Sequence, residues 1–222
     1  MRLLALFCLL ILLGSCQNDT PSDQQENTSK RFVDFYLRYL DSERMLKVEA
    51  TFSEGMDEKT ATTIDFENGV QFLDQKMALR KVRQQIHRYS YDNLADYPTN
   101  GTFPFAWESE KYELKMSPID NFQIIQASIS SGIQINLAKV LDKEESLICL
   151  LNDVQNNSIS IPMTIEGTTA NAPLSDYSEN LTTGKAEIYL VKKQIKSATV
   201  NAYQIKSMIE YYSKNTSIEL ME

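Results

Sequence analysis

The sequence predicts an all-β protein built from two tandem antiparallel β-sandwiches. Short runs of apolar and β-branched residues recur along the chain, and turns rich in Gly, Asn, Asp and Ser separate them. This spacing is typical of β-sandwiches and barrels. The pattern offers almost none of the crossover helices that a parallel α/β sheet needs. Apolar residues make up 42% of the chain, which is enough for buried cores and excludes global disorder.

The first sixteen residues predict export. Arg2 precedes an uncharged apolar run from Leu3 to Leu13, eleven residues long. A membrane-spanning helix needs roughly 20 residues, so this run fits a signal peptide better than a retained anchor. The run leads into Leu13-Gly14-Ser15-Cys16. A plain secretory signal with a chance cysteine is the alternative, and the polar stretch directly after Cys16 disfavours it.

These four residues resemble the lipobox of bacterial lipoproteins. The resemblance implies that residues 1–15 are a signal peptide, with Leu13, Gly14 and Ser15 as the positions that the signal peptidase recognises. It also implies that Cys16 carries diacylglycerol and a fatty acid such as palmitate. Each buried methylene contributes about 0.8 kcal/mol, so two or three acyl chains hold a protein stably. The expected location is the outer membrane, on its periplasmic or cell-surface face.

The stretch of residues 16–30 predicts a tether behind the lipidated cysteine. Residues 17–30 include no large apolar side chain, which is typical of a flexible, acidic-leaning linker. The net charge is −8, and loss of Arg2 with residues 1–15 makes it −9. Such an acidic protein is a poor partner for nucleic acid. Its net charge does not attract anionic lipid either, so the acyl chains must hold it at the membrane.

The cysteines predict a fold without an intramolecular disulfide. Cys8 leaves with the signal peptide and Cys16 is lipidated, so Cys149 has no partner. Cys149 lies within the apolar run Leu147–Leu151, where it is expected to be a small core residue. Stability must therefore come from packing.

The first sandwich is expected at residues 31–118 and opens with an ambiguous stretch. Residues 31–44 fit either one face of a helix or the alternation of a strand. Their aromatic content and the alternation of residues 45–52 favour a β-hairpin that turns at Asp41–Arg44. A helix followed by a strand stays open as the alternative.

The rest of this half alternates between short strands and turns. Strands are expected at Thr60–Phe66, Val70–Leu73, His87–Tyr91, Phe103–Trp107 and Tyr112–Met116. Asn68-Gly69 and Asn100-Gly101 are expected turns. Residues 77–85 are rich in helix formers and predict a short helix or a loop. Pro104 predicts an edge strand or a strand start for its segment.

The second sandwich is expected at residues 119–222. Its strands are expected at Phe122–Ile129, Ile133–Leu137, Leu147–Leu151, Ile159–Ile165, Ala186–Val191, Thr199–Tyr212 and Ile218–Met221. Leu181-Thr182-Thr183-Gly184, followed by a strand that carries Tyr189, is similar to the turn into the sixth strand of immunoglobulin-like and fibronectin type III domains. The resemblance covers residues 119–222. It implies an immunoglobulin-like scaffold whose loops bind, and it implies no chemistry.

No residue pattern points to catalysis, a metal or a cofactor. His87 is the only histidine, which excludes multi-histidine metal sites and leaves little for a Ser-His-Asp triad. Glycine-rich nucleotide loops are absent from the sequence. Neighbouring acids could serve glycoside hydrolysis or bind calcium, but they are expected at turns or on exposed strand faces. These acids are Asp57-Glu58, Asp65 and Glu67, Glu108 and Glu110, and Asp142, Glu144 and Glu145.

Aromatic residues leave one further alternative open. Phe103, Phe105 and Trp107 share one face of their expected strand. Aromatic side chains at this spacing are typical of a sandwich core. A stacking platform for sugars is the alternative.

The sequence as a whole predicts a non-enzymatic, lipid-anchored protein of the cell envelope. It would act as a binding or scaffolding module for another envelope protein. A carbohydrate-binding accessory protein with a platform around Trp107 is the alternative.

Overall fold

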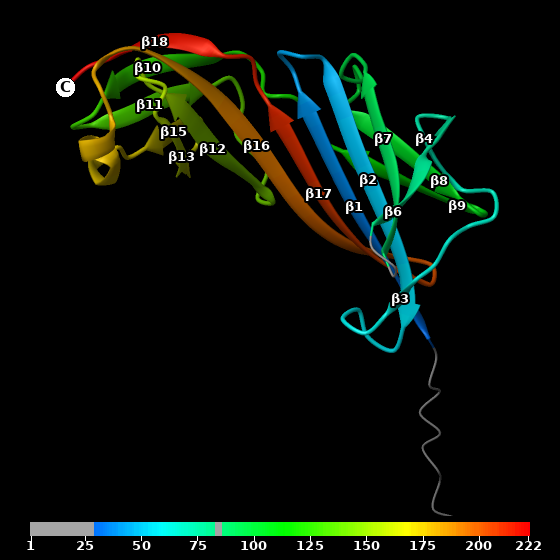
Figure 1. Cartoon of the computed structure of the whole chain (residues 1–222). Helices are drawn as coiled ribbons and strands as arrows, with labels where there is room; N and C mark the ends of the chain where they lie inside the picture. The colour runs from blue at the N-terminus through cyan, green and yellow to red at the C-terminus, as the bar shows by residue number, and fades with distance from the viewer. Residues whose placement is uncertain (1–28, 83–85) are drawn as a thin grey trace, which may run out of the picture.

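The computed structural model describes residues 29–82 and 86–222, and these residues are almost entirely β-structure (Figure 1). The predicted lipobox, Leu13–Cys16, lies outside the described residues. In the part of the chain that is described, no helix is long and apolar enough to cross a membrane.

The strands follow one another with a single short helix among them. In the first half they are β1 (Lys30–Leu40), β2 (Met45–Gly55), β3 (Thr62–Thr63), β4 (Val70–Phe72), β5 (Gln75–Lys76), β6 (Ala78–Val82), β7 (Ile86–Leu94), β8 (Thr102–Trp107) and β9 (Glu110–Lys115). In the second half they are β10 (Phe122–Ser128), β11 (Gly132–Leu137), β12 (Glu145–Asn152), β13 (Ser158–Pro162), β14 (Thr164–Glu166), β15 (Thr169–Ala172), the 3-10 helix η1 (Ser175–Asn180), β16 (Gly184–Val200), β17 (Tyr203–Tyr212) and β18 (Thr216–Leu220).

Three sheets build the fold. A ten-stranded sheet has the order β13-β12-β16-β17-β1-β2-β7-β6, with β18 paired to β16 and β3 paired to β2. Two four-stranded sheets, β5-β4-β8-β9 and β10-β11-β15-β14, pack on different parts of it. Figure 1 shows β16, in orange, running from one part to the other. The prediction of an all-β, sandwich-type fold is confirmed.

The first core lies between β4, β8 and β9 on one side and β17, β1, β2 and β7 on the other. It is rich in aromatic side chains because alternate residues of each strand point inward. Phe35 of β1 and Phe105 of β8 meet across the two sheets with ring centroids 4.2 Å apart. The second core lies between β10, β11 and β15 and strands β12, β13, β16 and β18, and its buried members are aliphatic or sulfur-containing residues.

Strand β17 connects the two halves of the chain. It pairs with β16 in an antiparallel hairpin and with β1 in parallel, so Val33 lies beside Ile205. Its residues Tyr203, Ile205, Ile209 and Tyr211 belong to the first core. The first core therefore takes side chains from beyond residue 118, and the division of the chain into domains at that position stays a prediction.

Several expected elements differ in detail from the structure. The hairpin of residues 31–52 is confirmed by β1 and β2. The helix or loop expected at residues 77–85 is wrong where the chain is described, because Ala78–Val82 pairs with β7 as a strand. Pro104 does not mark an edge, since β8 lies between β4 and β9. It is tolerated because β4 ends at Phe72, beside which the Pro104 carbonyl accepts a bond from Leu73 N at 3.1 Å.

Candidate functional site

One face of β16 changes character between the two cores. Ala186, Ile188 and Leu190 point into the second core, and Ala198 and Val200 pack against the first. The same face carries polar side chains in between. Lys192 and Gln194 are each only 2% exposed. A polar seam thus separates two apolar interiors, and we use this name for Ser117, Glu145, Lys192 and Gln194.

A buried ion pair forms the centre of the polar seam. Lys192 Nζ lies 3.2 Å from Glu145 Oε1, and their side chains are 2% and 4% exposed. Lys192 Nζ also donates to Ser117 Oγ at 3.0 Å. The second carboxylate oxygen, Glu145 Oε2, accepts a bond from Asp142 N at 3.1 Å. Both charges are therefore paired and hydrogen-bonded, which a buried ion pair needs if it is to offset several kcal/mol of desolvation per ion.

Gln194 extends the seam toward β9. With its amide turned so that both ends are satisfied, Gln194 donates to the Lys115 carbonyl at 2.9 Å and accepts from Lys196 Nζ at 3.2 Å. Lys196 in turn pairs with Glu144 at 3.3 Å, closer to solvent. The seam therefore runs from a buried centre to an exposed edge.

Two adjoining cavities open along the polar seam. Their volumes are about 190 Å³ and about 430 Å³. Both are lined by Ser117, Pro118, Asp120, Lys139, Asp142 and Glu145. Cavities of a few hundred Å³ with a few fixed polar groups are typical of sites for a small ligand or an inserted side chain. Charges of both signs line the walls, and Lys139 pairs with Asp120 at 2.6 Å on the rim.

The contacts of Ser117 and Lys192 bear on whether the seam could hold an activated nucleophile. A serine next to a lysine can act as a nucleophile when the amine removes its proton. Here the Lys192 ammonium donates to Ser117 Oγ and faces the Glu145 carboxylate. In this arrangement the Lys192 side chain is a hydrogen-bond donor to Ser117 and an ion-pair partner of Glu145.

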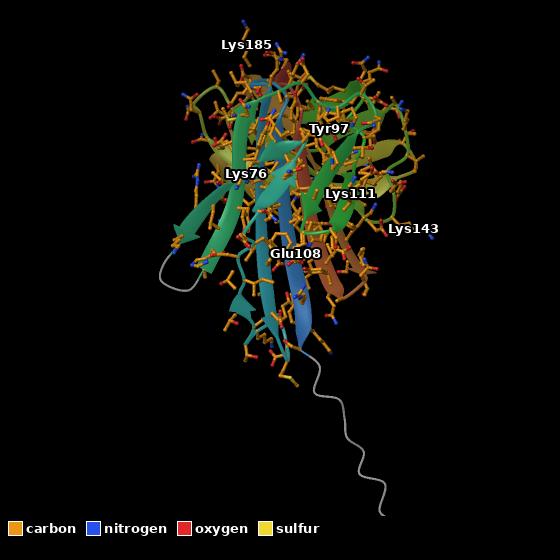
Figure 2. The ribbon with its side chains drawn as sticks, turned by 90° about the vertical axis from the view of Figure 1, so that its right-hand side faces the viewer. Lys76, Tyr97, Glu108, Lys111, Lys143 and Lys185 are labelled. Carbon is orange, nitrogen blue, oxygen red and sulfur yellow. The ribbon has the colours of Figure 1, made fainter. Side chains whose placement is uncertain are left out.

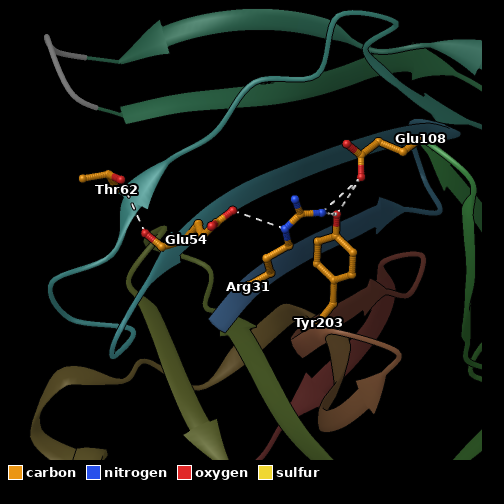
Figure 3. A network of polar contacts seen from close by, with 5 residues as sticks. All are labelled: Arg31, Glu54, Thr62, Glu108 and Tyr203. Atoms are coloured by element: carbon orange, nitrogen blue, oxygen red, sulfur yellow. Dashed lines mark hydrogen bonds and ion pairs between the residues drawn. The ribbon is translucent and has the colours of Figure 1, made fainter. Parts of the chain in front are cut away.

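A second polar network lies at the other end of the first core (Figure 3). The Arg31 guanidinium donates to Glu54 Oε2 at 3.2 Å and to Tyr203 Oη at 2.9 Å. Tyr203 Oη donates to Glu108 Oε2 at 2.9 Å. Burial raises the pKa of Tyr203, so its hydroxyl keeps the proton that it donates. This network joins the start of β1 to β2, to β17 and to the turn between β8 and β9.

A third cluster lies on the face of the large sheet that points away from the first core. Glu210 Oε2 accepts bonds from Tyr36 Oη at 2.7 Å and from Arg38 at 3.3 Å. Arg38 also lies over the ring of Tyr212, 5.2 Å from its centroid. Burial and the neighbouring Glu210 carboxylate raise the pKa of Tyr36. These groups satisfy one another, so the cluster holds β1 and β17 together and leaves little for a ligand.

The predicted aromatic platform is wrong. Phe103, Phe105 and Trp107 are 0%, 1% and 1% exposed, so none of them offers a ring face to a sugar. The favoured interpretation, a sandwich core, is what the structure has at these positions. The carbohydrate-binding alternative therefore has no exposed aromatic platform around Trp107.

His87 and Cys149 remain outside any site. His87 Nδ1 lies 2.5 Å from Asp65 Oδ2, an acid that the sequence did not connect with it. Cys149 is fully buried in the second core, where burial raises the pKa of its thiol to about 12. Among the described residues, the polar contact of His87 is with Asp65, and Cys149 is surrounded by apolar side chains.

The acidic groups divide into two kinds. Asp57 caps its own loop through Thr60 and is exposed, as expected. Glu145 was expected at a turn, and its N–H donates to the Asp142 carbonyl at 2.9 Å there, but its carboxylate is buried in the seam. In residues 29–82 and 86–222, no three His, Cys, Asp or Glu side chains come together as a metal site.

The seam residues carry only a weak signal in the sequence. Lys192-Lys193-Gln194-Ile195-Lys196 is polar on both faces of a strand, so the alternation that marks a buried face stops at Val191. In the structure the strand is longer than this alternation predicts, because β16 continues through the polar segment to Val200.

Comparison with known proteins adds no relative. No protein-family model matches this chain, and no curated protein matches it either.

Proposed function

We propose that this protein is a lipid-anchored outer-membrane lipoprotein that acts, without catalysis, as a binding or scaffolding module for another envelope protein. The observation that carries the binding site is the Lys192–Glu145 pair beside two adjoining cavities, the smaller lined by both residues and the larger by Glu145. Buried charges are costly, and local exceptions to the rule of apolar interiors are expected at functional sites. The seam is such an exception.

The lipobox motif at Leu13–Cys16 supports the anchor, and the strand register supports the orientation. Lys192 lies beside Tyr211 and Tyr211 beside Tyr39, so the seam lies near the far end of β1 from Lys30. Nine residues of extended strand at about 3.3 Å each correspond to about 30 Å. The seam would therefore face away from the membrane, where a partner can reach it.

The arrangement of the described side chains supports a role without catalysis. The paired groups of the seam leave Ser117 without a base, and the buried Cys149 thiol has a raised pKa. What remains is a preformed polar pocket with charges of both signs. Such a pocket suits recognition of a polar side chain or chain end of a partner protein.

Site-specific photo-crosslinking in cells tests the binding site. Val140 lines the smaller cavity and is 65% exposed, whereas Val154 is 53% exposed and lies away from the seam. A photoreactive residue at position 140 should give a defined adduct with an envelope protein, and one at position 154 should not. No adduct at position 140, or equal adducts at both positions, contradicts the proposal.

Metabolic labelling tests the anchor separately. Radiolabelled palmitate should enter the wild-type protein and place it in the membrane fraction. The Cys16→Ala variant should carry no label. Equal labelling of both proteins would contradict the lipid attachment.

A further inference from the structure

The hairpin of β6 and β7 differs in charge from the rest of this acidic chain. Between Asp74 and Asp92 the sequence has five Lys or Arg residues and no Asp or Glu, although the net charge of the whole chain is −8. Strand β6 is the last strand of the ten-stranded sheet. Its residues from Ala78 to Lys81 are all exposed.

Apolar and basic residues lie close together in sequence at the described end of this hairpin. Leu79 and Ile86 are 43% and 41% exposed. Arg80 and Lys81 lie between them in sequence and form no ion pair with any described residue. We call Leu79, Arg80, Lys81 and Ile86 the basic wing.

The acids near the basic wing are already occupied. Arg88 pairs with Glu49 at 2.8 Å and His87 pairs with Asp65. Glu58, at the same end of the sheet, pairs with Lys206. The positive charge of Arg80 and Lys81 is therefore not cancelled by a direct partner among the described residues.

The strand register places the basic wing at the end of the sheet where β1 begins. Tyr89 lies beside Ala50 and Ala50 beside Phe35, so β7 runs parallel to β1. Ile86 thus lies at the level of Phe32, two residues from Lys30. Three strand spacings of about 4.8 Å put β6 about 14 Å to the side of β1. Figures 1 and 2 both show the hairpin directed toward the end at which β1 starts.

The length of chain before β1 limits how far this end can be from the anchor. The fourteen residues from 17 to 30 separate Cys16 from β1. A chain spans at most about 3.6 Å per residue, so Lys30 stays within about 50 Å of the lipidated cysteine. The basic wing and the exposed Lys30 lie at this same end of the sheet.

We infer that the basic wing is a second membrane contact, which docks on an anionic lipid surface beside the acyl anchor. This inference rests on the proposed lipid anchor. Cations next to exposed aliphatic side chains suit an interface of anionic headgroups and acyl chains. The acidic remainder of the protein is repelled by the same surface, so the contact orients the molecule with the polar seam outward.

The local charge also corrects an expectation from composition. The net charge of the chain predicts no attraction to anionic headgroups. The fold separates the charges, and it places at one end a basic group that has no ion-pair partner among the described residues. A weak contact is sufficient here, because the anchor already holds the wing at high effective concentration near the lipid.

A single fluorescent probe on the acylated full-length protein tests the contact. The Leu79→Cys variant is labelled with an environment-sensitive dye, and Val154→Cys, 53% exposed and in the other half, is the control site. Cys149 is buried and its thiol pKa is raised to about 12, so it should not react with the dye. The proteins are reconstituted in vesicles of phosphatidylcholine alone or with one third phosphatidylglycerol.

The probe at position 79 should brighten at least twofold and shift to shorter wavelength in the anionic vesicles only. The control probe should not respond. Each basic residue near an anionic surface contributes about fivefold. Arg80→Glu with Lys81→Glu should therefore lower the fraction in contact tenfold or more. The matched reversal of the exposed Lys143 and Lys185, labelled in Figure 2, should leave the contact unchanged.

Three outcomes overturn the inference: the same emission in both kinds of vesicle, an equal effect of the two charge reversals, or a response to soluble polyphosphate without a response to vesicles. Failure of the anchor is distinguishable, since an unacylated protein would not float with phosphatidylcholine vesicles. In that case, sedimentation with anionic vesicles still decides about the basic wing. Selective sedimentation supports it, and its absence overturns it.

Discussion

The two cores of this protein each fill the space between two sheets, but with different kinds of side chain. The first core packs buried rings from six strands, among them Phe35, Phe52 and Trp107. The buried members of the second core, in the described chain, include no aromatic residue. Rings bury large areas but leave hydroxyl and indole groups that need partners. The first core should therefore be more sensitive to truncation and to pH, and the second mainly to lost volume.

Removal of one central ring should have the largest effect. Phe105 is 1% exposed and contacts the rings of Phe35 and Phe72. Phe105→Ala should lower the free energy of unfolding by about 3–5 kcal/mol. Ile135→Ala in the second core should cost about 2–4 kcal/mol. Urea unfolding followed by Trp107 fluorescence and by circular dichroism measures both, and a smaller loss for Phe105→Ala would refute the difference.

Removal of one charge from the seam between the cores should come next. Lys192→Met leaves the Glu145 carboxylate buried without its partner, so about 3–4 kcal/mol of stability should be lost. Lys143→Met, at an exposed position, is the matched control and should change stability by less than about 0.5 kcal/mol. Similar values for the two variants in urea unfolding would mean that the ion pair contributes nothing.

Alkaline pH should distinguish the two cores through their titrating groups. Burial raises the pKa of the Cys149 thiol to about 12 in the second core. It also raises the pKa of Tyr97 and Tyr211 at the first core above the ordinary value of 10. The folded state keeps these protons while the unfolded chain releases them, so stability is full below the unfolded pKa and falls as pH rises through the folded one.

The fall should begin at about pH 9, where an unfolded cysteine ionises, and steepen above pH 10 with the tyrosines. Cys149→Ala should remove the first part and Tyr97→Phe should flatten the second. Urea unfolding between pH 8 and pH 11 gives the slopes. Identical pH profiles for the wild type and both variants would argue against buried, protonated groups in either core.

Loss of the Arg31 network should have the smallest effect. The Arg31 and Glu54 side chains are 37% and 36% exposed, so solvent screens their attraction. Arg31→Ala should cost at most about 1 kcal/mol, and Arg31→Lys somewhat less because it keeps the charge. Thermal unfolding of the two variants checks this, and a loss as large as that of Lys192→Met would place the network among the core contacts.

Alternation in the sequence was sufficient to predict several of the strands and their buried faces. The hairpin of residues 31–52 and the buried face of Phe103, Phe105 and Trp107 follow directly from side-chain periodicity. The prediction for residues 78–82 is wrong because pairing with β7 overrides their helix propensity. Propensity describes single residues and contains no information on such a contact.

Contacts between distant parts of the chain could not be predicted. Strand β17 lies in parallel beside β1, about 170 residues earlier in the chain, and no local pattern specifies such a pairing. The polar seam likewise joins distant segments: Lys192 meets Glu145 because β16 pairs with β12, and Ser117 reaches Lys192 from the chain that follows β9. In the sequence, the seam residues resemble the solvated end of a strand. Their burial is evident only in the structure, where a core lies on either side of them.

The central claim is that the polar seam between the cores serves binding and not stability. The most direct measurement is the free energy of unfolding of the double variant Lys192→Met/Glu145→Leu. A buried ion pair replaced by apolar residues of similar size is often neutral or stabilising. The double variant should therefore lie within about 1 kcal/mol of the wild type or above it. A loss as large as that of Lys192→Met alone would show that the seam is a structural requirement, and would contradict the claim.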